Sequence, residues 1–456
     1  MNNIKRFLRD FTGFGIDDKR LNLAKKNILG SFIIKGLNIG ISLLLIPLII
    51  NYLEPTRYGI WITLSSIVGW FGFFDIGLGN GLRNRLAQAF AKDDQDLARI
   101  YISTTYAILT IIIIGVLVLF YIINPFLNWN NILNAAEDII APNELSLLAS
   151  FVFTFFSVQF VLKLINTILM ADQMPAKASL FDFMGKVISL IFIFILIKTT
   201  EGSLLSLGIA ISFSPLIVLI LSSIWFFNRK YKHIKPGLNF VKFDKAKDLF
   251  NLGTKFFIIQ IAVIFLYQTN NIIITQLFGP EQVTSYNVSF QYFSVLLMVS
   301  SILISPFWSA FTEAWVKNDI EWIKNVMKKL YIIWFFLLIT GILMLIFSKH
   351  IYNIWIGDKV LIPYLMSALV GIWILMITWN SIFSQFLNGI GKLKIQLYLG
   401  ISSAIINIPL AIFLGMKIGI FGVLLANIIV GLAGTIIYPI QYKKIINNHA
   451  KGIWND

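Results

Sequence analysis

The sequence contains no cysteine and few charged residues. The absence of cysteine from 456 residues excludes disulfides, thiolate metal sites and cysteine nucleophiles. Charged residues make up 13% of the chain and hydrophobic residues 57%, and the mean hydropathy is +0.80. That balance is too apolar for a soluble globular protein. We therefore expect a protein that is solvated by lipid and carries no redox chemistry.

Residues that could perform enzymatic chemistry are also scarce. The three histidines, His233, His350 and His449, all fall in predicted loops or in the tail. The longest predicted loop on the outer side, residues 124–145, contains no Lys, Arg or His. A membrane polymerase, glycosyltransferase or acyltransferase would need a base, a metal site or a sizeable extramembrane domain. We expect no enzyme, no cofactor and no bound metal.

Positive charge is abundant but is divided among many short segments. The net charge is +15, yet the basic residues lie between apolar runs and do not form one stripe with stacking aromatics, which argues against nucleic acid. The first residues, MNNIKRFLRDFTGFG, lack the apolar core and cleavage site of a signal peptide. Membrane topology explains the charges better, and we expect this segment to be retained.

Twelve apolar runs are long enough to cross a bilayer, which takes about 20 residues each. They predict an all-α integral membrane protein with twelve transmembrane helices in two pseudo-symmetric six-helix bundles. The first six runs cover residues 28–52, 60–82, 100–123, 146–169, 178–197 and 203–227. The second six cover residues 252–278, 284–309, 330–348, 361–388, 395–414 and 418–440.

The distribution of Lys and Arg predicts the orientation. The two ends of the chain and every second loop hold 28 of these residues, whereas the alternate loops hold 5. Because cytoplasmic loops retain positive charge, both termini are expected in the cytoplasm. The chain is predicted to begin with a cytoplasmic amphipathic N-terminus (1–27) and an N-terminal six-helix bundle (28–228). A basic cytoplasmic linker (229–251), a C-terminal six-helix bundle (252–440) and a cytoplasmic tail (441–456) follow.

An internal repeat supports the two-bundle architecture. Pro55 in LEP matches Pro280 in FGP, and the segment from Ala89 to Asp94 matches the segment from Ala314 to Asp319, both at an offset of 225 residues. Each half has an even number of predicted spans, so both halves enter the membrane in the same sense. A central pathway between the halves is expected.

Three segments combine an apolar face with basic residues, at 4–11, 243–250 and 320–327. They predict short helices lying on the cytoplasmic surface of the membrane. The alternative is that they are ordinary basic linkers near anionic lipid.

Charged residues within the predicted spans are the strongest indication of function, because each is costly unless paired or hydrated. They lie toward the cytoplasmic side and are Lys35, Asp75, Lys163, Asp182, Lys186 and Lys255. The lysines predict an electropositive vestibule that binds an anionic headgroup such as a pyrophosphate. Asp75 and Asp182 are candidates for tuning a lysine or binding a coupling cation.

Structural explanations of these charges remain open. The lysines can extend toward the interface, and Asp182 and Lys186, four residues apart, can neutralise one another. Arg83 and Arg85 follow the glycine-rich end of the second span, where they either meet phosphate or set topology.

The second half is almost uncharged within its spans but carries two groups of polar residues. They are predicted to line a hydrated cavity for sugar, or else to form hydrogen bonds between helices. One group is Gln268, Asn270 and Asn271, and the other is Thr378, Ser381, Gln385 and Asn388.

Three stretches resemble a known family. The segments NYLEPTRYGIW and FGFFDIGLGNGLRNRLAQAFAKDD, together with FGPEQVTSYNVSFQYF in the second half, resemble bacterial O-antigen flippases. These proteins form the polysaccharide-export branch of the multidrug/oligosaccharidyl-lipid/polysaccharide superfamily. The resemblance implies a V-shaped pair of bundles in the bacterial inner membrane. It also implies flipping of a polyprenyl-pyrophosphate-linked oligosaccharide to the periplasmic leaflet, with proton or sodium coupling and cationic residues of the first half holding the pyrophosphate.

A cation-coupled multidrug antiporter of the same superfamily is the alternative function. Cationic drugs favour a carboxylate-rich cavity, whereas four lysines and two aspartates are predicted within the spans here. The sign of the charge favours an anionic cargo.

Overall fold

We describe a computed structural model of the chain over residues 19–71, 78–172, 174–246, 268–304 and 307–455. The described residues are mainly helical and include no strand. The predicted amphipathic segment at 4–11, the first part of the seventh predicted span and the charged candidates Asp75 and Lys255 lie outside the described residues.

The first half is a bundle of long helices joined by short ones. Its helices are α2 (Lys19–Leu53), α3 (Pro55–Trp70), α4 (Leu78–Ala91), α5 (Gln95–Ile123), α6 (Trp129–Ile132), α7 (Pro142–Leu162), α8 (Leu164–Ala171), α9 (Pro175–Thr199) and α10 (Leu204–Asn228). Three short 3-10 turns follow in the linker: η3 (Lys232–Ile234), η4 (Leu238–Phe240) and η5 (Phe243–Lys245).

The second half repeats this plan. Residues 268–278 are helical. The helices that follow are α12 (Pro280–Ile304), α13 (Phe307–Val316), α14 (Ile320–Ile356), α15 (Tyr364–Ile390), α16 (Lys394–Ile418) and α17 (Ile420–Ile446). Ten helices in the described part of the chain are long and apolar enough to cross a membrane. The predicted second and seventh spans pass through residues that are not described.

The two repeats form the same turn at equivalent positions. Asp93 and Asn318 have left-handed φ angles of 55° and 56°. The next residue in each repeat caps a helix, because Asp94 accepts a hydrogen bond from the backbone of Leu97 at 2.9 Å, and Asp319 accepts one from Trp322 at 3.0 Å. A capping carboxylate satisfies one of the amides that a helix start leaves free. The repeat at an offset of 225 residues is therefore confirmed at the level of local structure.

One prediction about the repeat region is wrong. The segment 320–327 does not lie on the membrane surface, because it forms the first turns of the 37-residue helix α14. Ile323 and Met327 are 0% and 1% exposed, and they pack in a cluster with Phe311 and Phe386. The apolar face that suggested contact with lipid is satisfied by contact with the protein core.

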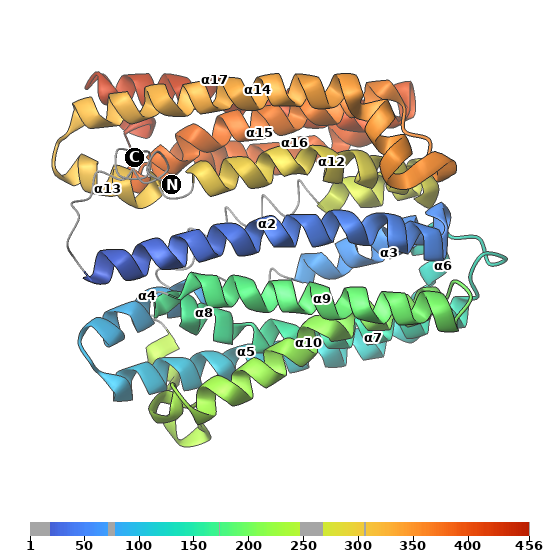
Figure 1. Ribbon diagram of the computed structural model, residues 1–456, viewed down its shortest axis with the longest axis horizontal. Helices are drawn as coiled ribbons and strands as arrows, with labels where there is room; N and C mark the ends of the chain where they lie inside the picture. Colours follow the sequence, from blue (N-terminus) through green and yellow to red (C-terminus); the bar gives the residue numbers. More distant parts are fainter. Residues whose placement is uncertain (1–18, 72–77, 173, 247–267, 305–306, 456) are drawn as a thin grey trace.

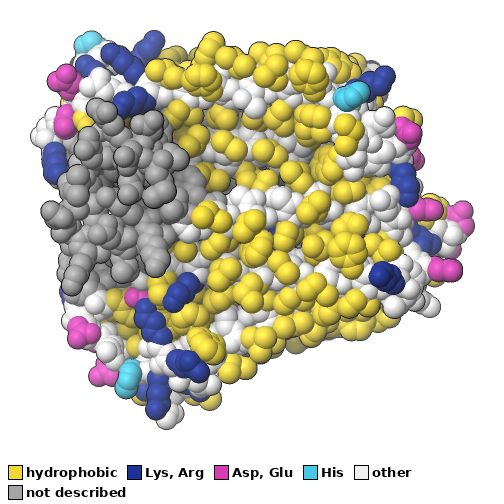
Figure 2. Space-filling model, in the orientation of Figure 1, with side chains coloured by type: hydrophobic (Ala, Val, Ile, Leu, Met, Phe, Trp, Pro, Cys, Tyr) yellow, Lys and Arg dark blue, Asp and Glu magenta, His cyan; other side chains and the backbone are white. Residues whose placement is uncertain are grey.

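The long helices run side by side along the long axis of the molecule (Figure 1). The helix α2 begins, and α17 ends, at the same end of the bundle, where the linker η3–η5 also lies. Hydrophobic side chains form a broad band across the middle of the molecule, and charged side chains gather at its two ends (Figure 2). This distribution matches a bilayer that surrounds the band. We call the end where α2 begins and α17 ends the terminal end, and the other the distal end.

Candidate functional site

A lysine of the first half is held within the helix bundle by hydrogen bonds. Lys186 on α9 donates from Nζ to Ser42 Oγ on α2 at 2.7 Å. Ser42 donates in turn to the carbonyl oxygen of Asn38 at 2.8 Å, and the Asn38 amide approaches the Ser179 carbonyl oxygen at 3.4 Å. The half-buried ammonium of Lys186 is therefore fixed against α2. Both members of the predicted pair Asp182 and Lys186 are described, and no salt bridge joins them.

A cavity of about 230 Å³ lies beside this network, between the two halves. Lys35, Asn38 and Lys186 line it from the first half. Its remaining wall comes from α12 of the second half and consists of Met298, Ser301 and Ile302, with Ile39 completing the lining. The structure thus brings together two of the predicted lysines, and no carboxylate lies among the described lining residues. Such a site favours an anion that both ammonium groups can contact.

A third predicted lysine marks a break in a helix. Lys163 ends α7 and precedes α8. Its positive charge and that of Lys186 both act on the Asp182 carboxylate. Lys163 and Asp182 are exposed rather than buried. Asp182 and Lys186 therefore lie about one turn apart on α9, and Lys163 at the break between α7 and α8 is near enough for its charge to act on Asp182.

At the distal end the two halves cross in close contact through equivalent residues. A Cβ added to Gly59 would lie 1.8 Å from the Pro280 carbonyl oxygen. At the repeat offset of 225 residues, Thr284 is equivalent to Gly59 and Pro280 is equivalent to Pro55. The equivalent contact is a hydrogen bond from Thr284 Oγ1 to the Pro55 carbonyl oxygen at 2.6 Å. The helices α3 and α12 therefore cross at the pseudo-two-fold axis, and only a glycine fits at position 59.

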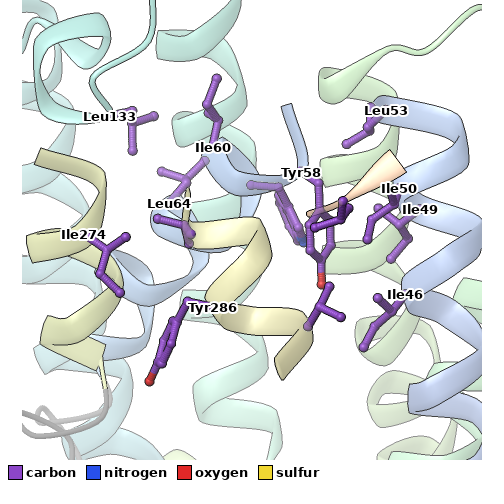
Figure 3. Close-up of a cluster of buried hydrophobic side chains, with 14 of the residues drawn as sticks. Ile46, Ile49, Ile50, Leu53, Tyr58, Ile60, Leu64, Leu133, Ile274 and Tyr286 are labelled. Carbon is purple, nitrogen blue, oxygen red and sulfur yellow. The ribbon is translucent and has the colours of Figure 1, made fainter. Parts of the chain in front are cut away.

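Further hydrogen bonds join the halves near this crossing. Tyr58 donates to Asn287 Oδ1 at 3.1 Å, and Trp355 Nε1 donates to the Leu43 carbonyl oxygen at 2.9 Å. The hydroxyls of Thr63 and Thr275 lie 2.5 Å apart. Figure 3 shows the apolar side chains packed around this region, from α2, α3 and both sides of the crossing: Ile46, Ile49, Ile50, Leu53, Tyr58, Ile60, Leu64, Ile274 and Tyr286. The bonds and the apolar packing close the molecule at its distal end.

The first predicted group of sugar-binding residues lies at this closed end. Asn271 Nδ2 donates across the halves to Ser66 Oγ at 2.8 Å. The Gln268 amide packs against Gly69, so that a Cβ added there would lie 3.0 Å from Gln268 Nε2. Asn270 approaches the Tyr286 hydroxyl at 3.5 Å within the second half. Asn271 and Gln268 therefore lie at the contact between α3 and the helical residues 268–278.

The second predicted group lies elsewhere, along α15. Thr378 and Ser381 donate to backbone carbonyls of their own helix, at 2.8 Å each. Gln385 Oε1 is buried and has no partner among the described residues. Asn388 lies one turn farther toward the terminal end of α15. The structure does not bring the two groups together as one sugar cavity.

Arg83 and Arg85 lie on α4 at the terminal end. Arg83 is exposed, and Arg85 donates to Gln88 Oε1 at 3.2 Å. They are separate from the lysine cavity, as far as its described lining shows.

Sequence reasoning missed the residues that hold and close the site. Ser42 and Asn38 gave no signal because they are small polar residues within an apolar run. Tyr58, Gly59 and Thr284 lie within the stretches that carry the family resemblance. Those stretches form the crossing of α3 and α12. The contact between the halves therefore explains why residues of these types stand there.

A second, larger cavity does not lie on the path between the halves. It measures about 900 Å³ and is lined by residues 346–364 alone, at the distal end of α14 and the loop that follows. Its walls come from one half, so we do not assign transport to it.

Comparisons with known proteins agree with this architecture. The chain is 24% identical to a putative O-antigen transporter of Salmonella typhimurium over 90% of its length and 94% of that protein. It is also 24% identical to a putative O-antigen export protein of Yersinia pseudotuberculosis, over 76% of this chain and 79% of that one.

Solved structures share the fold. An inward-facing multidrug resistance MATE family transporter of the MOP superfamily superposes with a TM-score of 0.76 at 13% identity, covering 93% of this chain and all of that one. An outward-facing MATE structure gives 0.66 at 15% identity, over 93% of this chain and 96% of the other. The MatE family model matches residues 256–413. The family model whose description is polysaccharide biosynthesis protein matches residues 24–312, which is more than half of the sequence. The chain belongs to the polysaccharide biosynthesis protein family, with the fold of MOP superfamily transporters.

Proposed function

We propose that this protein flips a polyprenyl-pyrophosphate-linked oligosaccharide from the cytoplasmic to the periplasmic leaflet of a bacterial inner membrane. The observation that carries the proposal is the cavity between the halves, where Lys35 and Lys186 face one space without a carboxylate among its described lining residues. A pyrophosphate is the part of such a lipid that two ammonium groups bind best. The names of the two relatives, an O-antigen transporter and an O-antigen export protein, support the cargo.

The proposed topology has twelve transmembrane helices, two pseudo-symmetric bundles and both termini in the cytoplasm. The domain limits are those expected from the sequence. The excess of Lys and Arg at the terminal end supports this orientation. The distal end is then periplasmic and closed, and the molecule is inward-facing. The higher TM-score against the inward-facing relative, 0.76 rather than 0.66, supports this state.

In the proposed cycle, Lys35 and Lys186 hold the pyrophosphate after it enters from the cytoplasmic side. Lys163 extends this positive region, and Arg83 and Arg85 attract the headgroup at the mouth. Lys255, which lies outside the described residues, is proposed from the sequence as a further cationic partner of the headgroup. Opening of the crossing between α3 and α12 then exposes the cavity to the periplasm. Asp182 and Asp75 are the proposed carboxylates for coupling to H⁺ or Na⁺, since a coupling cation needs an anionic partner.

The sugar has a different proposed environment. Gln268, Asn270 and Asn271 form the polar ceiling of the inward-facing space, where hydroxyl groups of the glycan can replace their hydrogen bonds. Thr378, Ser381, Gln385 and Asn388 are proposed as a second polar surface that becomes accessible as the bundles move.

The test is a leaflet-resolved assay of lipid-linked oligosaccharide in vesicles with and without the protein. The wild type is expected to move the lipid, and Lys35→Gln with Lys186→Gln is expected to abolish movement because the anion loses both cationic partners. Lys198→Gln is a matched control, since Lys198 is an exposed lysine at the other end of α9. Unchanged flipping by the double variant at equal expression would overturn the proposed site.

A cation-coupled multidrug antiporter is the second candidate, favoured by the MatE match over residues 256–413 and by the MATE fold. Measuring drug resistance in drug-susceptible cells that express the chain distinguishes the antiporter from the flippase. The antiporter would raise resistance to cationic drugs, and this resistance would not depend on Lys35 or Lys186.

A further inference from the structure

The linker between the halves is fixed to the outside of the first bundle. Arg99 Nε on α5 donates to the Lys235 carbonyl oxygen at 2.9 Å, and its guanidinium lies 3.7 Å from the centroid of the Phe240 ring. The Gly237 amide donates to Ser103 Oγ at 3.2 Å, and the Lys242 amide donates to Thr104 Oγ1 at 2.9 Å. These bonds hold residues 235–242 along the first turns of α5.

The start of the linker is anchored as well. Asp172 accepts a hydrogen bond from the Tyr231 hydroxyl at 2.8 Å and forms a salt bridge with Lys230. Burial, together with the hydrogen bond to Asp172 and its negative charge, raises the pKa of the Tyr231 hydroxyl. The linker is therefore a docked element and not a free tether.

An apolar cavity of about 560 Å³ lies between the linker and α5. Its walls are mainly apolar and include Ala107, Ile111, Leu238, Val241 and Phe243. Leu238 is 89% exposed and Phe243 is 59% exposed, although both belong to a docked segment. Exposed apolar side chains held in place at this level of the bundle indicate contact with lipid.

One buried polar atom beside this cavity lacks a partner among the described residues. The Tyr106 hydroxyl is buried and makes no hydrogen bond with any described residue. The Tyr106 ring packs edge-on against Phe227, with ring centroids 6.2 Å apart, and it lines the cavity beside Ser103 and Thr110. Because this hydroxyl is buried, the ring is the part of Tyr106 that faces the cavity.

The rim of the cavity is strongly basic. Residues 229–245 contain six Lys or Arg residues and one carboxylate, Asp244. Of the lysines, Lys235 and Lys242 are exposed and Lys245 is half-buried. Nearby, Trp225 is 54% exposed and stacks with Arg229, whose guanidinium carbon lies 3.8 Å from the ring centroid. Exposed tryptophan beside basic residues is typical of the headgroup level of a membrane.

We propose that α5 and the linker form a binding site for an anionic phospholipid of the cytoplasmic leaflet. One acyl chain lies in the cavity against Leu238 and Phe243, and the phosphate lies among Lys235, Lys242 and Lys245. Basic pockets of this kind between membrane helices bind anionic headgroups. The substrate lipid is not the occupant, because α5 and the linker supply all described walls and the cavity between the halves lies elsewhere. Bound lipid fixes the linker to the first bundle.

The test uses the full chain purified in detergent, with dioleoyl phosphatidylglycerol as the anionic probe and dioleoyl phosphatidylcholine as the zwitterionic one. Native mass spectrometry is expected to show tighter binding of phosphatidylglycerol. The triple variant Lys235→Gln, Lys242→Gln and Lys245→Gln should weaken it on the order of 100-fold, because each cation near a lipid surface contributes about 1 kcal/mol. Control substitutions at the distal end, Lys349→Gln with Lys359→Gln, should leave it unchanged.

A second measurement does not require the triple variant to fold. Because the chain has no cysteine, Leu238→Cys gives one labelling position for an environment-sensitive fluorophore. Phosphatidylglycerol with brominated acyl chains should quench this fluorophore more strongly than brominated phosphatidylcholine does. A label at Leu361→Cys, which replaces a leucine that is 86% exposed at the distal end, should not distinguish the two lipids. Equal quenching at position 238 by both lipids, or unchanged phosphatidylglycerol binding by the folded triple variant, would overturn the proposal.

Discussion

At the scale of single residues, the decisive feature is how Lys186 is kept within the bundle. A lysine in a membrane helix usually extends toward the interface, but Lys186 donates to Ser42 at 2.7 Å and lines the same cavity as Lys35. Two ammonium groups that share a space repel each other until an anion enters. Their arrangement therefore favours binding of an anion in this cavity, which is what the proposed function requires.

Replacing Ser42 with Ala is expected to reduce flipping about tenfold, because a hydrogen bond to a charged group contributes about 1.5 kcal/mol. The Lys186 ammonium would lose its fixed position beside the cavity. Ser42→Thr keeps the hydroxyl and should retain most of the activity. The leaflet-resolved assay measures both variants at matched expression.

Ser402→Ala is the control for this substitution. Ser402 is an exposed serine on α16 that donates to the carbonyl oxygen of Leu399 in its own helix. The Ser402→Ala variant should flip lipid at the wild-type rate. If Ser42→Ala did so too, Ser42 would have no positioning role.

At the scale of helices, the crossing of α3 and α12 requires a residue without a side chain at position 59. A Cβ at position 59 would meet the Pro280 carbonyl oxygen at 1.8 Å, a separation that backbone atoms cannot accept. We expect Gly59→Ala to force these helices apart at the distal end and to reduce flipping strongly. Reactivity of a cysteine introduced at Ser66 toward an impermeant reagent in the external solution should rise at the same time.

The matched control is Gly115→Ala on α5, where an added Cβ has nothing within 4 Å. Alanine in an exposed helix interior is more favourable than glycine by about 1 kcal/mol, so this variant should be at least as stable and fully active. Wild-type transport by Gly59→Ala would show that the crossing tolerates separation and does not control access.

Ten of the twelve predicted spans correspond to described helices that are long and apolar enough to cross a membrane, because the signals for such helices are local. Runs of apolar residues marked the spans, and the match between the segments beginning at Ala89 and Ala314 marked the repeat. The prediction for the segment 320–327 was wrong for the same reason. A local pattern shows that a helix has an apolar face, but it does not show whether lipid or a side chain such as Phe311 covers that face.

Contacts between distant helices could not be predicted in this way. The bond from Lys186 to Ser42 joins residues 144 positions apart, and the bond from Thr284 to Pro55 joins residues 229 apart. A single sequence contains no signal for such pairs. The polar residues Gln268 and Asn271 were identified as functional candidates, but only the structure places them at the contact between the halves.

At the scale of the whole molecule, the distal closure combines apolar packing with hydrogen bonds between the halves. One set of five hydrogen bonds joins long helices of the two halves there, from Tyr58, Thr63, Asn271, Thr284 and Trp355 to their partners. Asn134 and Gln276 form further bonds across the halves, between the loop of the first half and the residues that precede α12. Bonds between membrane helices contribute about 0.6 kcal/mol each, so the set amounts to about 3 kcal/mol. This contribution alone corresponds to a factor of roughly 150 in favour of the closed state. It can be offset when polar groups of a bound cargo take over these hydrogen bonds.

This closure can be locked covalently, because the chain has no cysteine to interfere. Ser66 and Asn271 contact each other across the halves, with Ser66 Oγ and Asn271 Nδ2 at 2.8 Å. The double variant Ser66→Cys and Asn271→Cys is expected to cross-link on mild oxidation and to stop flipping, and reduction should restore it. Each single cysteine variant controls for the substitution and should be insensitive to oxidant. Transport by the fully cross-linked protein would mean that the distal end does not open during the cycle, and the cargo would then have to leave by another route.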